Sequence, residues 1–460
     1  MSLGDARRQK SKQLELALMS MGESQRGQHS GEASTATSGN ERPGNPDERL
    51  MELVVDAVNI GEAYRRVKSN KGSPGVDGMT VWALPKYLAV EWPRIREELL
   101  SGTYQPSPVK QQEIEKTDGG IRRLGIPTVL DRLIQQAILQ VIQPEIDASF
   151  SSSSYGYRPR ISAHDGVRAA QRHIQSGKTW VADADISAFF DNVNQDILMD
   201  RLSKRIPDKR LLKLIRSYLR AGIMVNGVRM EREEGTPQGG PLSPLLANVL
   251  LDEVDKELEK RGLAFCRYAD DCNVYVASKR AADDAMELLK KLFTRLHLKV
   301  NESKSAVGRP WERKFLGYSF YEARKGKIAP YTAVKSLEKM KAKVREITNR
   351  NKGRNIHQVV KKLCDFLIGW RRYFSLDTEK ESFRKLDRWI RRRLRVLELR
   401  QWKTGRTTFK RLRARGVDVE ATKIVASRCQ RFWYITGQTI IDRAMPDDYY
   451  DDLGVPVLTT

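Results

Sequence analysis

The stretch Phe265–Val276, with the sequence FCRYADDCNVYV, decides how this chain folds. Its apolar flanks predict two short strands, and Asp270 and Asp271 lie at the turn that joins them. Adjacent carboxylates at the tip of a hairpin repel each other unless a cation lies beside them. Aspartate is also a common turn residue, so this stretch by itself fits either a metal site or ordinary turn chemistry.

A second stretch offers a partner strand. Trp180–Ile186 alternates around Val181 and predicts a strand with Asp183 and Asp185 on one face. Phosphoryl transfer to a growing nucleic acid uses two divalent cations about 3.5–4 Å apart. Such hard cations prefer carboxylate oxygens, and main-chain oxygens complete their coordination shell. Asp185, together with the two aspartates of the hairpin, is therefore a candidate metal-binding set.

The composition indicates a polyanionic partner. The 460 residues include 82 Lys and Arg against 58 Asp and Glu, a net charge of +24. Nucleic acid fits this excess better than an anionic membrane surface does. No apolar run approaches the roughly 18 residues of a spanning helix, so we expect no membrane segment. The four cysteines show no Cys-x-x-Cys pair, which favours a reduced compartment and argues against a zinc module.

Local patterns predict where the chain is globular. Residues 22–48 are rich in Ser, Gly and Thr and predict a flexible linker after a short extension. Apolar residues at helical spacing predict a helix over residues 131–143. Ser243 and Pro244 predict the N-cap and first position of a second helix, which Gly262 ends.

The charge is concentrated in residues 331–420, which hold 27 Lys and Arg against 10 Asp and Glu. Periodic apolar residues such as Leu386 and Leu394 run through the same segment. We therefore expect a helical bundle with a buried face and a basic outer face that binds a polyanion. The last 20 residues reverse the sign of the charge, and one interpretation is a cap that folds back on the basic surface.

The chain carries an ordered series of seven short motifs: Asn70–Gly78, Arg122–Pro127, Tyr155–Pro159, Ala184–Ile186, Gly235–Pro244, Tyr268–Asp271 and Phe315–Tyr318. On these motifs the chain is similar to reverse transcriptases encoded by group II introns, from about residue 55 to the end. The resemblance implies an α+β right-hand polymerase with fingers, an antiparallel palm sheet and a helical thumb that doubles as the maturase domain.

The resemblance also implies a domain order. We expect an extension and linker, then the fingers, the palm with the catalytic site, the thumb with maturase function, and a short DNA-binding segment. No His-Asn-His endonuclease pattern with paired cysteines follows residue 420, so we expect the type without that domain. The corresponding ranges are 1–48, 49–179, 180–329, 330–417 and 418–460.

Site roles follow from the matching motif positions. Asp185, Asp270 and Asp271 match the family's catalytic metal-binding triad, and Ile186 joins the metal group through its main chain. Two Mg²⁺ ions are the implied cofactors. Asp183 is the runner-up ligand, with a solvent-facing or supporting carboxylate as the alternative.

The nucleotide site is implied in the same way. Phe190 matches the aromatic residue beside the incoming sugar, where it would select deoxynucleotides, whereas Phe189 reads as core. Gln238 lies in the Gly/Pro loop beside the nucleotide. Lys116 and Arg122 match the fingers residues that grip the triphosphate, a role that suits cations. Lys304 matches a position near the primer end.

In the thumb we expect Arg391, Arg392 and Arg393 to face RNA. The implied function is an RNA-directed DNA polymerase that binds a group II intron RNA, promotes its splicing and copies it into DNA during retrohoming. Its partners would be the intron RNA, a DNA target or primer and dNTPs, in a ribonucleoprotein of the bacterial cytoplasm and nucleoid. The oligomeric state stays open.

Other classes of function stay open as alternatives. One is a splicing maturase whose polymerase activity is secondary, and the intact aspartate triad argues against it. Another is a different microbial reverse transcriptase, such as a defence-associated one, and the long basic thumb argues against that. An RNA-dependent RNA polymerase is disfavoured by Phe190.

Overall fold

The computed structural model describes residues 49–115, 120–225, 228–230, 234–236, 239–349, 355–428 and 432–459. The predicted linker, Lys116 and Gln238 lie outside these residues, as does the side chain of Arg122. The chain divides into two compact units. The N-terminal unit runs to Gly166 and resumes from Trp180 to Val307, and the C-terminal unit comprises Val167–Thr179 and Gly308–Thr460.

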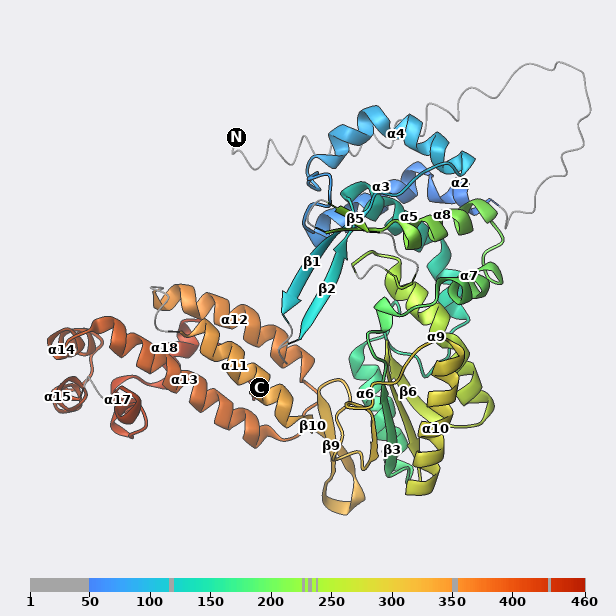
Figure 1. Ribbon diagram of the computed structural model, residues 1–460. Coiled ribbons are helices and arrows are strands. Elements are labelled where there is room, and N and C mark those ends of the chain that lie inside the picture. Colours follow the sequence, from blue (N-terminus) through green and yellow to red (C-terminus); the bar gives the residue numbers. More distant parts are fainter. Residues whose placement is uncertain are drawn as a thin grey trace, which may run out of the picture. The chain divides into compact units, whose positions relative to one another are not determined.

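The N-terminal unit is organised around a four-stranded sheet in the order β6-β7-β3-β8 (Figure 1). Both β6 and β3 pair antiparallel with the central strand β7. This confirms the antiparallel palm sheet expected from the sequence. The strands are β3 (Trp180–Asp185), β6 (Ala264–Tyr268), β7 (Asp271–Val276) and β8 (Ala306–Gly308).

Two helices cover one face of this sheet, α9 (Ser243–Lys260) and α10 (Lys279–Arg295). The residue before α9 is Leu242, and no side chain caps its start, so Ser243 is the first helical residue rather than the predicted cap. Apolar side chains at helical spacing along α9 are buried against the sheet, which fixes that face as the interior.

A helical layer and a small mixed sheet complete the N-terminal unit. The predicted helix over 131–143 is the centre of α5 (Val129–Ala148), which Thr128 caps through a hydrogen bond from Asp131 N. The sheet has the order β2-β1-β4-β5, with β1 and β4 parallel. Its strands are β1 (Val109–Glu115), β2 (Ile121–Ile126), β4 (Ile223–Val225) and β5 (Val228–Met230), and the remaining helices are α2 (Leu50–Val54), α3 (Ala57–Asn70), α4 (Leu84–Ser101), α7 (Gln195–Ser203) and α8 (Lys209–Arg220).

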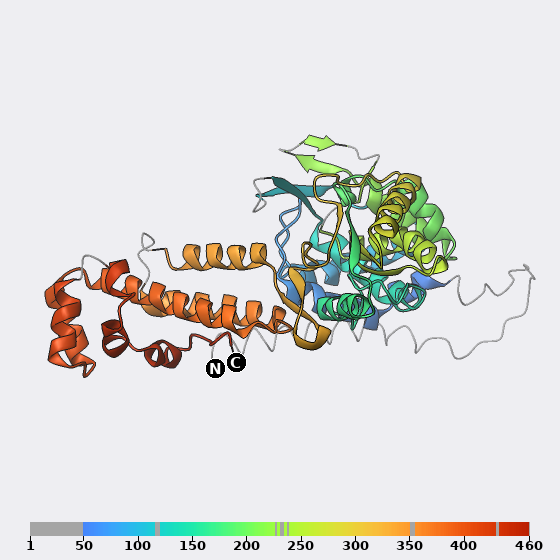
Figure 2. The same ribbon diagram turned by 90° about the horizontal axis from the view of Figure 1, so that it is seen from below.

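The C-terminal unit is mainly helical, as the basic segment predicted. Its three longest helices are α11 (Val334–Ile347), α12 (Ile356–Tyr373) and α13 (Lys380–Trp402). Helix α12 packs against both α11 and α13, and the three lie side by side in both views (Figure 2). An antiparallel hairpin, β9 (Tyr318–Glu322) and β10 (Ile328–Thr332), precedes them. Shorter helices follow: α14 (Gly405–Ala414), α15 (Val419–Ser427), α16 (Phe432–Ile435), α17 (Ile440–Ala444) and α18 (Asp447–Asp452).

The residues assigned to α6 (Ala163–Gln175) reach into the C-terminal unit, where Gln171 donates to Ile328 O at 2.7 Å. The compact division therefore falls after Val307, and residues 167–179 group with the C-terminal unit. The finer division into fingers, palm, thumb and DNA-binding segment stays a prediction.

Candidate active site

The register of the strands places one carboxylate of the hairpin beside that of Asp185. Tyr268 pairs with Asp271 across β6 and β7, so Ala269 and Asp270 form the turn. β3 pairs with β7 in the register that sets Asp185 opposite Asp271. Directly opposed residues point to the same face with Cβ atoms roughly 5 Å apart. The carboxylates of Asp185 and Asp271 therefore lie side by side, and Asp270 is the next residue along the turn.

All three of these aspartates are partly exposed, so a substrate can reach them. Asp183 shares their face opposite Asn273, but it is only 8% exposed. The solvent-facing interpretation of Asp183 is therefore wrong, because the side chain is buried two positions further into the strand.

The segment before β8 holds Asp185 in place. Asn301 N donates to Asp185 O at 2.8 Å, and Asp185 N donates to Ser305 Oγ at 2.9 Å. Lys304 Nζ lies 3.4 Å from Asp185 Oδ2, with its side chain more than half exposed. The sequence singled out Lys304, but Asn301 and Ser305 were missed because their role depends on a strand 120 residues away.

The donor set suits a hard divalent cation, since it offers carboxylate oxygens on adjacent strands. Within the described ranges, however, no three acidic, His or Cys side chains are gathered around one point. The register thus brings Asp185 and Asp271 together, and Asp270 lies in the adjoining turn without completing a three-carboxylate cluster. This arrangement fits metals that share their coordination with a substrate's phosphates.

The two phenylalanines lie on a short 3₁₀ helix, η2 (Phe189–Asp191), directly after β3. Their rings meet edge to face with centroids 5.2 Å apart, and both are buried. Phe190 O accepts a hydrogen bond from Thr236 N at 2.8 Å, which ties η2 to the loop that carries Gln238. Phe189 lies in the core as expected, and the sugar-selecting role of Phe190 stays a prediction.

Glycines let the Gln238 loop approach its neighbours closely. Gly235 has a φ of +86°, and a Cβ there would lie 2.8 Å from Phe190 O. Gly239 has a φ of +128°, and its Cβ would lie 2.5 Å from Gly125 O of β2. Although Gln238 is outside the described residues, its neighbours thus lie against both η2 and the strand that carries Arg122.

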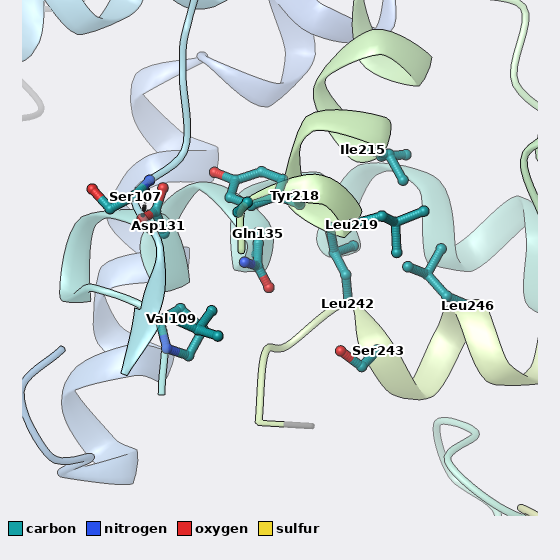
Figure 3. Close-up of a pocket in the computed structure, with 12 residues that line it drawn as sticks. Ser107, Val109, Asp131, Gln135, Ile215, Tyr218, Leu219, Leu242, Ser243 and Leu246 are labelled. Atoms are coloured by element: carbon teal, nitrogen blue, oxygen red, sulfur yellow. Dashed lines mark hydrogen bonds between the residues drawn. The ribbon is translucent and has the colours of Figure 1, made fainter. Parts of the chain in front are cut away.

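A buried acid, Asp131, lies in the first turn of α5 (Figure 3). Asp131 accepts hydrogen bonds from Thr128 Oγ1 at 2.6 Å, Tyr104 OH at 2.9 Å and Ser107 N at 3.2 Å. Burial raises the pKa of Asp131 to about 6. The adjoining cavity, about 20 Å³ in volume, has room for one water molecule and not for a nucleotide.

The structure corrects the expectation for one of the three thumb arginines. Arg391 is only 2% exposed and pairs with Asp387 and Asp451, so it faces the interior and not RNA. Arg392 stacks over the Trp433 ring at 4.1 Å from the ring centroid, and Arg393 donates to Thr348 Oγ1 at 2.8 Å. Both are partly exposed, and their RNA contact stays a prediction.

The acidic C-terminal segment packs on α13, as the cap interpretation expected. Arg395 pairs with Asp447 at 2.7 Å and with Asp442 at 3.2 Å. Tyr450 OH donates to Glu398 Oε2 at 3.0 Å. Residues 418–428 and 432–459 are therefore part of the helical unit rather than a separate tail, and the local reversal of charge indicated this in the sequence.

An antiparallel sheet backed by two helices, with carboxylates facing each other at a hairpin tip, is the arrangement expected of the palm of a right-hand polymerase. Residues 114–320 match the family model of reverse transcriptases, described as RNA-dependent DNA polymerases. Residues 337–416 match the maturase-specific domain of group II introns. The chain belongs to the family of group II intron reverse transcriptases and maturases, and its catalytic class is RNA-directed DNA polymerase.

The chain is also similar in part to individual proteins. Protein YkfC of Escherichia coli is 35% identical over 301 residues, which cover 56% of this chain and 79% of YkfC. The group II intron-encoded protein LtrA of Lactococcus lactis is 34% identical over 206 residues, covering 45% of this chain but only 34% of LtrA. A chain of a solved partial Cas6-RT-Cas1–Cas2 complex is 25% identical, with a TM-score of 0.36 over 58% of this chain and 46% of that chain.

The family match confirms the resemblance, the fold class and the enzyme class expected from the motifs. In the part of the chain that the structure describes, no helix is both long and apolar enough to cross a membrane.

Proposed function

We propose that the chain copies a group II intron RNA into DNA at Asp185, Asp270 and Asp271, and that it promotes splicing of the same RNA. The observation that carries the proposal is the register of β3 and β7, which sets Asp185 opposite Asp271 beside the turn with Asp270. Two Mg²⁺ ions held there would activate the primer's attacking oxygen and neutralise charge on the transferred phosphate. Ile186 would contribute its main-chain oxygen.

Other side chains have separate tasks in this proposal. Lys304, already 3.4 Å from Asp185 Oδ2, stays near the primer end and balances the acidic charge. Phe190 lies against the sugar of the incoming dNTP and excludes a 2′-hydroxyl. Lys116 and Arg122 grip the triphosphate, and Gln238 lies beside the nucleotide.

The C-terminal unit would hold the intron RNA. A hollow of about 560 Å³ opens between α12, α13 and the C-terminal residues. Arg371, Arg372 and Lys380 line it, and all three can pair with phosphate. Arg392 and Arg393 of α13 would contact the RNA elsewhere on this unit, and the exposed rings of Trp433 and Tyr434 offer stacking surfaces for a DNA target or primer. The chain would act as a ribonucleoprotein in the bacterial cytoplasm and nucleoid.

The test is primer extension on an RNA template with Mg²⁺ and dNTPs. The variant Asp270→Ala/Asp271→Ala should lose extension by about 10³-fold or more, because metal stabilisation is worth several kcal/mol. Its binding to a group II intron RNA should change little, since the C-terminal unit is untouched.

A matched control is Asp283→Ala/Asp284→Ala. These adjacent aspartates are exposed on α10, so the control removes the same two charges away from the site. It should extend primers normally. Undiminished extension by the Asp270/Asp271 variant would rule out the assignment, and loss of extension by both variants would show a nonspecific effect of charge.

A further inference from the structure

A buried arginine lies directly beneath the metal-bearing turn. Arg267 is the next-to-last residue of β6 and is only 1% exposed. Side chains alternate along a strand, so Arg267 points to the opposite face from Tyr268 and Asp271, toward α9. There it pairs with Asp255, whose side chain is fully buried, at 2.6 Å.

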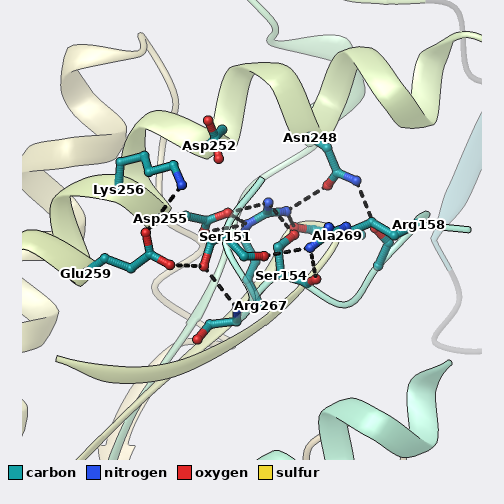
Figure 4. Close-up of polar contacts among 12 residues, drawn as sticks. Ser151, Ser154, Arg158, Asn248, Asp252, Asp255, Lys256, Glu259, Arg267 and Ala269 are labelled. Atoms are coloured by element: carbon teal, nitrogen blue, oxygen red, sulfur yellow. Dashed lines mark hydrogen bonds and ion pairs between the residues drawn. The ribbon is translucent and has the colours of Figure 1, made fainter. Parts of the chain in front are cut away.

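The guanidinium uses all of its donors (Figure 4). Nε and Nη2 both donate to Asp255, and Nη2 also donates to Ser154 Oγ at 2.8 Å. Nη1 donates to Asn248 Oδ1 at 3.0 Å and to the main-chain oxygen of Ala269 at 2.9 Å. The last of these bonds reaches the turn residue that immediately precedes Asp270.

The turn needs such support because its backbone is strained. Ala269 has a φ of +59°, in the left-handed region that residues with a Cβ rarely adopt. The segment Ser153–Gly156 braces the same turn from the other side, since Tyr155 N donates to Arg267 O at 2.8 Å. At Gly156 a Cβ would collide with Ala269 N. Asn248 links the two supports, because its Nδ2 donates to Gly156 O at 2.8 Å.

A contribution to the stability of the fold does not by itself explain the buried Arg267–Asp255 ion pair. A buried ion pair often contributes no more than apolar side chains of the same volume would, because both ions must be desolvated. Five directed bonds do, however, fix one geometry. We propose that Arg267, held by Asp255, is a positioning residue that locks the Ala269–Asp270 turn and so sets where the two hairpin carboxylates meet the metals. This inference rests on the proposed metal role of Asp270 and Asp271.

The decisive variant is Arg267→Met/Asp255→Leu, which removes both charges together and leaves no orphaned ion. We expect kcat for primer extension to fall about 10- to 100-fold, the effect of a misplacement of about 1 Å, with KM for dNTP and primer–template affinity within about twofold of wild type. Mn²⁺ binding to the protein–primer–template complex, followed by electron paramagnetic resonance, should weaken several-fold. This second readout does not depend on turnover.

The matched control lies one turn earlier on the same helix. Asp252 pairs with Arg205 at 2.6 Å. Among the described residues, this ion pair makes no hydrogen bond to the hairpin turn. Arg205→Met/Asp252→Leu makes the same chemical change and should keep wild-type kcat and Mn²⁺ affinity. If the Arg267/Asp255 variant also keeps both, the ion pair only stabilises the fold and the inference is overturned.

Two further variants decide the matter if the double variant does not fold. Arg267→Lys keeps a charge opposite Asp255, but its single ammonium cannot also reach Ser154, Asn248 and the Ala269 carbonyl. Gly156→Ala disturbs the turn from the other side without touching the ion pair. Loss of kcat and of Mn²⁺ affinity in Arg267→Lys supports the inference, and wild-type values in that variant overturn it. Gly156→Ala gives the reference loss for a displaced turn.

The Asp270→Ala/Asp271→Ala variant separates this inference from the function on which it rests. If that variant still extends primers, the proposed metal site has failed. If it loses extension while the Arg267 variants extend and bind Mn²⁺ normally, only the positioning role has failed.

Discussion

Phe189 and Phe190 show how little burial alone says about the role of a residue. They are adjacent on η2, are 3% and 8% exposed, and belong to the same buried cluster. Their rings differ in direction by an interplanar angle of 77°. Burial and ring geometry do not single out either residue, and the motif position alone favours Phe190 as the one beside the sugar.

Phe190→Val should therefore lower discrimination against ribonucleotides about tenfold or more, because a smaller side chain leaves room for a 2′-hydroxyl. The measurement is the ratio of kcat/KM for dNTP and rNTP on a primed RNA template.

Phe189→Val is the matched control for this prediction. It removes the same atoms from a more deeply buried position and should lower stability by roughly 1–4 kcal/mol without changing sugar selection. Unchanged discrimination in Phe190→Val would remove the sugar-selecting role from that residue.

At the scale of the element, α5 anchors the sheet that carries Arg122 and the loop that carries Gln238. Its first turn combines the Thr128 cap with the buried acid Asp131. Gly240 lies so close to Gln135 of the same helix that a Cβ would collide with its amide oxygen. Substitutions at the start of α5 should therefore alter the proposed nucleotide-binding site.

Asp131 predicts a specific pH dependence of stability. Burial raises its pKa to about 6 against hydrogen bonds from Thr128 and Tyr104 that lower it. The folded state thus holds the proton more tightly than the unfolded chain. The corresponding stability is complete below about pH 4 and is lost as the pH rises through about 6, a change of roughly 3 kcal/mol. Relative to Asp131→Asn, the wild type should lose unfolding free energy between pH 4 and 7 in denaturant titrations.

Asp208, the cap of α8, provides a control of opposite sign. Burial would raise its pKa, but hydrogen bonds from Arg210 and from Met51 N outweigh that effect and hold the pKa below its ordinary value. Relative to Asp208→Asn, the wild type should gain stability as the pH rises. A difference between wild type and Asp131→Asn that does not vary with pH would contradict the assignment to Asp131.

At the scale of the whole molecule, the excess of positive charge does not translate directly into an RNA-binding surface. Two arginines of α13, Arg391 and Arg395, pair with carboxylates of the acidic C-terminal segment instead. The cations free to meet phosphate are instead those with exposed side chains, among them Arg372 and Lys380 at the hollow beside α12.

Arg372→Ala/Lys380→Ala should weaken intron RNA binding and reduce the slope of log affinity against log salt by up to about two, since each lost phosphate contact lowers the slope by about one. Lys290→Ala/Lys291→Ala on α10 removes the same charge elsewhere and should leave the slope unchanged. Filter binding or fluorescence anisotropy across salt concentrations measures both.

Arg391→Ala should behave differently, because its ion partners Asp387 and Asp451 would be left without it. It should cost about 3–5 kcal/mol of stability in a denaturant titration while leaving the salt slope as in wild type. The assignment of the RNA-binding cations would be wrong if Arg372→Ala/Lys380→Ala kept the salt slope of the wild type. It would also be wrong if Arg391→Ala reduced that slope.

What the sequence by itself determined is local or cumulative. Sequence patterns predicted a strand over Trp180–Ile186, a hairpin around Asp270 and Asp271, and the central part of the helix α5. The charge of residues 331–420 predicted a basic helical unit and a polyanionic partner. Each of these depends on neighbours in the chain, so a linear pattern carries it.

Only the tertiary structure decided how these pieces meet. The register that sets Asp185 opposite Asp271, the hold of Ser305 on Asp185 and the burial of Arg391 all join residues 60 or more positions apart. Whether an arginine is a surface cation or a buried partner depends on which distant segment desolvates it, and no local pattern records that. Arg267 is the clearest example: in the sequence it is one basic residue of 82, and in the fold it lies beneath the turn that carries the two aspartates.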